Sequence, residues 1–167
     1  RLVFTHEGQK TIDRTIYEEE CLAVLVPDAV GDVESVLVPV RGTVGLDRLA
    51  RVASGLFAET DATITLYHVV EENETEEDVQ TLLDGVAARL SETGIDSTRI
   101  RTTIVPDEKI LDAIAAAAES FDVIVVGESD PSIATFIFGM RAEKVAKQFL
   151  GPVFIVQRER PEDDDSE

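Results

Sequence analysis

The residues best suited to chemistry stand around two glycines near the end of the chain. A run of apolar residues from Phe121 ends at Gly127, and a second glycine, Gly139, opens a helical pattern. This strand, loop and helix order is typical of an open parallel sheet, in which the loop lies at the carboxyl edge. Free backbone N–H groups at the helix N-terminus can receive an anion there. The stretch therefore predicts an anion-binding loop.

Two arginines are predicted to reach the same edge of the sheet. Arg41 follows the apolar run at residues 36–40, and Arg141 follows Gly139. Two guanidinium groups at one edge could hold a small anion or a nucleotide by bidentate contacts. The favoured alternative is that Arg41 pairs with Asp130 of the loop, so that an internal salt bridge replaces a ligand.

No catalytic or metal site can be argued from the remaining residues. His68 stands in an apolar strand and is better interpreted as a satisfied core histidine than as a base or metal ligand. Cys21 is the single cysteine, which excludes an intramolecular disulfide, and cysteine and histidine are too few for a structural zinc site. We therefore expect a protein that is not an enzyme and holds no metal.

The charge balance limits the partners and the compartment. Lys+Arg 15 against Asp+Glu 34 gives a net charge of −19, which would repel nucleic acid and anionic membranes. Such an acidic, lysine-poor composition favours a protein from a halophile, where salt screens the repulsion, over an ordinary acidic cytoplasmic protein. With no secretory signal and no apolar run near the ~20 residues that span a bilayer, we expect a cytoplasmic location. Because the chain begins with Arg1, we also expect that it is a piece of a longer protein.

Strand and helix patterns alternate along the chain. The expected strands are residues 21–27, 36–40, 62–70, 99–105, 121–126 and 153–156. The expected helices are residues 45–57, 76–93, a stretch opened by Pro106 and Asp107, and 139–149. Thr43 is expected to cap the first helix and Gly94 to end the second. This order predicts a parallel α/β sheet with helices on both faces and right-handed crossovers.

Three segments are predicted. Residues 1–33 form an N-terminal linker or arm with a short extra strand, and residues 34–158 form the domain. Residues 159–167 form an acidic tail that lacks apolar residues and is expected to be disordered.

Five short phrases of the sequence, in order and at suitable spacing, resemble a universal stress protein domain. They are Val36-Leu-Val-Pro-Val40 with Gly42-Thr43, Leu66-Tyr-His-Val-Val70, Asp122-Val-Ile-Val-Val-Gly127, Gly139 with Ala142-Glu-Lys-Val145, and Pro152-Val-Phe-Ile-Val156. The resemblance implies a flavodoxin-like three-layer sandwich with a five-stranded parallel sheet of order 3-2-1-4-5. It also implies a homodimer through the last strand, at Val153, Phe154, Ile155 and Val156.

One branch of this family binds ATP, and part of its site is matched here. The matching residues, which line the nucleotide pocket in that branch, are Pro39, Val69, Val126, Gly127 and Gly139. The three apolar residues of this set are equally compatible with an ordinary core at the strand ends. Both glycines suit the turn with or without a ligand.

The ATP-binding branch of the family has an Asp after the first strand and the loop pattern G-x2-G-x9-G-[ST]. This sequence departs from that pattern at four points. Arg41 stands in place of the Asp, and Asp130 in place of the second glycine. Eight residues instead of nine precede Gly139, and Met140 replaces the hydroxyl residue. The resemblance therefore implies a degenerate loop in which ATP binding of the family type is lost. No cofactor is required, although ATP or another adenine nucleotide stays a candidate ligand.

These observations predict a non-enzymatic regulatory or ligand-sensing module. Domains of this family are also found fused to membrane transporters, so a covalently linked upstream membrane domain is an expected context. The alternative is a nucleotide-binding stress-response protein that binds ATP or AMP and has weak ATPase activity.

Overall fold

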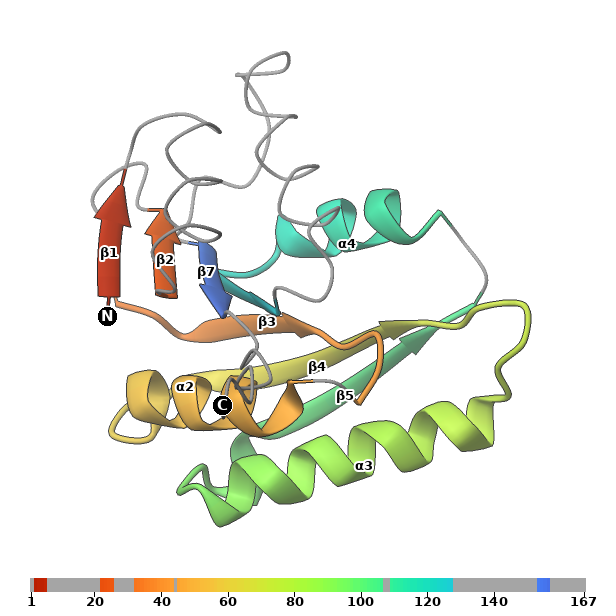
Figure 1. Ribbon diagram of the computed structural model, residues 1–167, viewed down its shortest axis with the longest axis horizontal. Coiled ribbons are helices and arrows are strands. Elements are labelled where there is room, and N and C mark those ends of the chain that lie inside the picture. The colour runs from red at the N-terminus through yellow and green to blue at the C-terminus, as the bar shows by residue number, and fades with distance from the viewer. Residues whose placement is uncertain are drawn as a thin grey trace, which may run out of the picture.

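A seven-stranded β-sheet runs through the part of the chain that the computed structural model describes (Figure 1). This part comprises residues 2–5, 22–25, 32–43, 45–106, 109–127 and 153–156. The strands are β1 Leu2–Thr5, β2 Leu22–Leu25, β3 Ser35–Pro39, β4 Thr63–Val69, β5 Ile100–Val105, β6 Val123–Gly127 and β7 Val153–Val156. The helices are α2 Leu46–Phe57, α3 Glu76–Glu92 and α4 Ile110–Ala118, with a short 3-10 turn, η1, at Ser97–Arg99.

The strands lie in the order β1-β2-β7-β6-β3-β4-β5. Within it, β5, β4, β3 and β6 are neighbours paired in parallel, which confirms the predicted α/β fold and the order 3-2-1-4 of the first four strands of the series. β7 pairs in parallel with β6. Beyond β7, β2 pairs antiparallel and β1 pairs parallel to β2. The sheet is therefore wider than the predicted five strands, because the N-terminal arm adds two strands to it. β2 lies within the extra strand expected at residues 21–27, whereas β1 was not expected.

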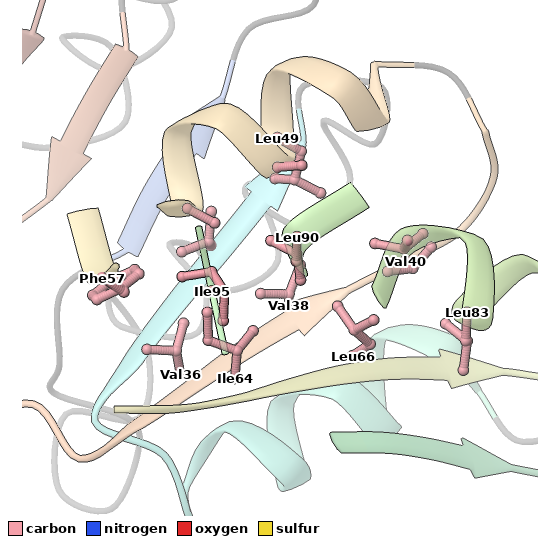
Figure 2. Packing of buried hydrophobic residues seen from close by; sticks show 14 of the residues in the cluster. Val36, Val38, Val40, Leu49, Phe57, Ile64, Leu66, Leu83, Leu90 and Ile95 are labelled. Carbon is pink, nitrogen blue, oxygen red and sulfur yellow. The ribbon is translucent and has the colours of Figure 1, made fainter. Parts of the chain in front are cut away.

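The central strand β3 separates two apolar cores because its side chains alternate between the faces of the sheet. Leu37 points to the face covered by α4, which packs there through Ala113 and Ile114. The opposite face packs against α2 and α3, which lie below the sheet in Figure 1. Figure 2 shows the larger core, whose labelled members are Val36, Val38, Val40, Leu49, Phe57, Ile64, Leu66, Leu83, Leu90 and Ile95. Helices thus cover both faces, as predicted.

Local signals explain where α3 and α2 begin and end. The Thr75 hydroxyl accepts from the Asp78 backbone N–H at 3.2 Å and caps α3. Gly94, at φ 112, follows the end of α3 as predicted. The predicted cap of α2 is wrong: the N-cap residue is Gly45, at φ 77, and no side chain caps it. Thr43 lies two residues before that position, so its hydroxyl is not at the N-cap.

Arg99 fixes the end of α2 against the start of β5. Its guanidinium donates to the carbonyl oxygens of Phe57 at 3.2 Å and Ala58 at 3.3 Å. It also donates to the carbonyls of Thr60 and Ala62, just beyond the helix. A cation here satisfies carbonyl groups that the helix leaves without intrahelical partners and complements the helix dipole.

Asp122 closes the amino edge of the sheet. Its Oδ2 atom accepts from the backbone N–H groups of Glu34 at 3.0 Å and Ser35 at 2.9 Å, and from the Ser35 hydroxyl at 3.0 Å. Burial opposes the charged form, but these three donors outweigh it and hold the pKa of Asp122 below its ordinary value. The carboxylate therefore ties the entry of β3 to the entry of β6.

Candidate functional site

The carboxyl edge of the parallel sheet is where β3, β4 and β6 end, at Pro39, Val69 and Gly127. Parallel strands that are neighbours end at a common edge, so this edge is the place where α/β sheets bind ligands. The described residues of the predicted site all lie there: Pro39, Arg41, Val69, Val126 and Gly127. The remaining predicted site residues, Asp130, Gly139, Met140 and Arg141, lie outside the described residues.

The apolar members of the predicted site belong to the core. Val69 is 5% exposed and Val126 is 1% exposed, and both are in the apolar cluster under α4. Pro39 is also buried, and its Cα is paired with that of Tyr67 on β4. Packing accounts for these three residues without a ligand, which favours their interpretation as ordinary core residues at the ends of strands.

Arg41 lies just beyond β3 and reaches across to the loop that follows β4. Its Nη2 atom is 2.9 Å from Glu71 Oε1, and both side chains are partly exposed. The guanidinium is thus already engaged with a carboxylate at the edge where an anion would be expected to bind. The predicted pair of Arg41 with Asp130 stays a prediction, because Asp130 is outside the described residues.

His68 is held in the core at the same edge, and its side chain is only 1% exposed. Its Nδ1 atom is 2.7 Å from the Val40 carbonyl oxygen, and its Nε2 atom is 2.8 Å from Glu74 Oε2. Because a carbonyl oxygen can only accept, Nδ1 carries a proton. The prediction of a satisfied core histidine is confirmed, and burial denies this ring the access that a catalytic base needs.

Glu74 links His68 to the loop. Its Oε2 atom accepts from the Glu71 backbone N–H at 3.0 Å as well as facing His68. Burial works against the charged form, but the Glu71 N–H, the His68 ring and the nearby Arg41 guanidinium lower the pKa of Glu74 below its ordinary value. An ionised carboxylate is therefore part of this edge at neutral pH.

Together these contacts form what we call the edge network, consisting of Arg41, Glu71, Glu74, His68 and the Val40 carbonyl. It joins the end of β3 to the loop between β4 and α3. Sequence reasoning missed Glu71 and Glu74. The available signal was a pair of carboxylates, three residues apart, directly after a strand that ends in His68-Val-Val70.

The part of the chain that the structure describes contains neither a metal-binding cluster nor a membrane-spanning helix. No group of three or more His, Cys, Asp and Glu side chains in this part of the chain could hold a metal ion. No described helix has the length and apolar character needed to cross a bilayer.

Comparison with known proteins identifies the family. The model of the universal stress protein family matches residues 33–157. The chain belongs to the universal stress protein family. No curated protein matches the sequence.

Solved structures of other universal stress proteins share the fold of this domain. One, from Archaeoglobus fulgidus in complex with dAMP, is 15% identical with a TM-score of 0.54, over 75% of this chain and 98% of that one. Another, from Arabidopsis thaliana with AMP bound, is 20% identical with a TM-score of 0.53, over 78% of this chain and 97% of that one. A third, from Archaeoglobus fulgidus DSM 4304, is 17% identical with a TM-score of 0.57, over 99% of this chain but 61% of that one. At these identities the likeness establishes the fold of the universal stress domain.

Proposed function

We propose that this universal stress domain is a non-enzymatic regulatory module whose family-type ATP site has been lost. The observation that carries the proposal is the 2.9 Å ion pair between Arg41 and Glu71. Arg41 occupies the position after the first family strand at which the ATP-binding branch has an Asp. An internal ion pair stands at the edge where that branch receives its nucleotide.

Electrostatics support the loss of polyphosphate binding. Glu71 and Glu74 both lie at the carboxyl edge, and Asp130 follows in the loop sequence. Two like unit charges ~4 Å apart repel by about 1 kcal/mol in water and about 4 kcal/mol near a protein surface. A triphosphate would have to displace Glu71 from Arg41 and then face the carboxylates. A smaller anion or another ligand that Arg41 and Arg141 could share meets less repulsion.

The wider context is part of the same proposal. The acidic, lysine-poor composition supports an origin in a halophile, where concentrated salt screens a net charge of −19. The family's known fusions to transporters support a role as the cytoplasmic sensing domain of a membrane protein. In that role the ligand or partner at the carboxyl edge would be sensed and would not be turned over.

The alternative function is binding of ATP or AMP with weak ATPase activity. It is favoured by one specific observation: universal stress proteins of the same fold have been solved with dAMP and with AMP. A monophosphate carries less charge than ATP, so it is the nucleotide that the edge network would tolerate best.

A titration with phosphate-release measurement separates the two functions. The full chain, in concentrated salt and verified as folded by circular dichroism, is titrated with a fluorescent ATP analogue and, by calorimetry, with AMP. We expect no micromolar binding of ATP and no phosphate release. Tight ATP binding with turnover would overturn the proposal in favour of the alternative.

A pair of double variants tests whether the site is an altered ATP site. Arg41→Asp with Asp130→Gly restores two residue types of the ATP-binding branch, and we expect at least a tenfold gain in ATP affinity. The matched control is Arg101→Asp with Asp130→Gly, because Arg101 is an exposed arginine on β5 and its replacement changes the net charge equally. Equal ATP affinities for the two variants would contradict the idea.

A further inference from the structure

The two N-terminal strands repeat, on the other side of β7, the arrangement of β6 and β7. β1 and β2 are parallel neighbours joined through residues 6–21, and β6 and β7 are parallel neighbours joined through residues 128–152. Each connection is long enough for the crossover that parallel strands require. In the sheet order β1-β2-β7-β6, the pair β1–β2 and the pair β6–β7 are therefore equivalent, and their second strands, β2 and β7, are neighbours.

The β1–β2 pair and the β6–β7 pair contact each other through β2 and β7, with the geometry of two equivalent surfaces related by a two-fold axis. β2 and β7 run antiparallel, with Ala23 opposite Ile155, Val24 opposite Phe154 and Leu25 opposite Val153. Antiparallel contact between equivalent strands has a local two-fold axis, which is the symmetry of a homodimer interface. Phe4 stands beside Val24 on one side of that axis, as Val125 stands beside Phe154 on the other.

The comparisons give a second, independent indication. The family model begins at residue 33, so it leaves β1 and β2 outside. The longer universal stress protein chain from Archaeoglobus fulgidus DSM 4304 nevertheless matches 99% of this chain, whereas the dAMP complex matches 75%. The fold that includes β1 and β2 thus has a counterpart within a longer chain of the same family.

We propose that β1 and β2 stand in for the last two strands of a second universal stress domain. By pairing with β7, they provide within one chain the sheet extension that would otherwise require a dimer. The partner of the β7 edge is then residues 22–25 of the same chain. This arrangement competes with the predicted homodimer through Val153–Val156, since one edge of β7 cannot pair with two strands at once.

A disulfide trap in the full chain tests the pairing. Val24→Cys and Phe154→Cys are combined with Cys21→Ser, which removes the native thiol. Directly opposed residues of antiparallel strands have Cα atoms about 4.5–5.5 Å apart, within the range that a disulfide spans. Mild oxidation of dilute protein should give a monomer that migrates faster without reductant, and peptide mapping should find the two cysteines linked.

The matched control is Phe4→Cys with Phe154→Cys in the same background. Both positions flank Val24, so two strand spacings of about 4.8 Å separate them and no intrachain disulfide should form. The proposal would be overturned if the Val24→Cys, Phe154→Cys variant formed mainly disulfide-linked dimers. It would also be overturned if the folded variant formed no disulfide. An equal intrachain link in the control would also overturn it.

Hydrogen exchange provides a measurement that does not depend on cysteine variants. In dilute monomer, the amides of β7 should be protected to the same extent as those of β6, because both strands are paired on two sides. Val24→Pro removes an N–H group from β2 and should lower the protection of β7 at least tenfold while that of β4 is unchanged. Unchanged protection of β7 in this variant would contradict the pairing.

Discussion

The Nε2 atom of His68 lies 2.8 Å from Oε2 of Glu74, while Nδ1 of the same ring lies 2.7 Å from the Val40 carbonyl oxygen. The carbonyl can only accept a hydrogen bond, and an ionised carboxylate also only accepts. Nδ1 therefore donates to the carbonyl, and the ring joins the end of β3 to the loop after β4 at the edge of the core.

The proton on Nδ1 can be observed directly. In ¹⁵N NMR of the full chain, the Nδ1 signal of His68 should show a bound proton, because this atom faces the Val40 carbonyl oxygen. The only other histidine is His6, so His6→Asn assigns the signals. An Nδ1 atom of His68 without a proton would contradict the hydrogen bond to the Val40 carbonyl.

Glu74 also predicts how stability depends on pH. Its pKa in the folded chain is lower than the ordinary value of 4.5. A depressed carboxylate pKa contributes stability above the unfolded value, and that contribution is lost as pH falls below 4.5 through the folded value. Glu74→Gln should therefore lower the urea midpoint at pH 7 and make its decline between about pH 5 and pH 3 shallower.

The control for this prediction is Glu72→Gln, an exposed neighbour in the same loop. At pH 7 and a fixed salt concentration, its urea midpoint should stay close to that of the unaltered chain. If the Glu74 and Glu72 variants give the same urea midpoint, the contacts of Glu74 with His68 and the Glu71 N–H do not contribute to stability.

The regular elements of this domain were predictable because their signals are local. The β-branched and apolar runs at residues 36–40 and 62–70 predicted β3 and β4, and Gly94 predicted the end of α3. Each of these outcomes depends on residues within one turn or one strand. The cap of α2 was predicted wrongly because Thr43 and Gly45 are both plausible caps, and only the path of the backbone selects between them.

The site and the sheet edge were less predictable because they depend on contacts between distant residues. Arg41 lies in the loop after β3, and its partner Glu71 lies in the loop after β4. Because the chain has so many acidic residues, its sequence does not indicate which glutamate pairs with Arg41. The position of β1 beside β2, and of β2 beside β7, is set by pairing between the two ends of the chain. A short apolar run indicates a strand but does not indicate its neighbour.

Asp122 should be important for stability at the amino edge of the sheet. Its Oδ2 atom accepts from three donors on Glu34 and Ser35, so Asp122→Asn removes an acceptor and places amide hydrogens near other donors. Because Asp122 is exposed, we expect a loss of about 0.5–1.5 kcal/mol in the free energy of unfolding. Asp61→Asn, in an exposed loop, is the control and should change stability by less than about 0.5 kcal/mol. Similar values for both variants in urea denaturation would show that the Asp122 contacts are unimportant.

Arg99 should not tolerate replacement by lysine. Its guanidinium donates to the carbonyls of Phe57, Ala58, Thr60 and Ala62, whereas an ammonium group is a single point with three donors. Arg99→Lys should lower the free energy of unfolding by about 1–3 kcal/mol. The control is Arg101→Lys on the exposed side of β5, which should be close to neutral. An Arg99→Lys variant as stable as the unaltered chain would show that a charge alone suffices at the end of α2.

Two glycines in and after α3 should respond to alanine in opposite directions. Gly85 lies within the exposed part of α3, and a Cβ atom there would meet no atom within 4 Å, so Gly85→Ala should stabilise the domain by about 0.5–1 kcal/mol. Gly94 has φ +112, which alanine rarely adopts. A Cβ atom there would lie 3.6 Å from Ser54 Oγ, an ordinary contact, so the cost arises from the backbone conformation. Gly94→Ala should therefore destabilise the domain by about 1–2 kcal/mol.

Thermal denaturation at fixed salt measures both glycine variants on the same scale. For a chain of this size, about 1 kcal/mol corresponds to a shift of roughly 2–4 °C in Tm. Gly85→Ala should raise Tm and Gly94→Ala should lower it, because the first removes chain entropy from the unfolded state and the second strains the folded state. An unchanged or higher Tm for Gly94→Ala would mean that the turn after α3 can adopt another backbone conformation, and that the contact between α2 and the end of α3 does not depend on the conformation found here.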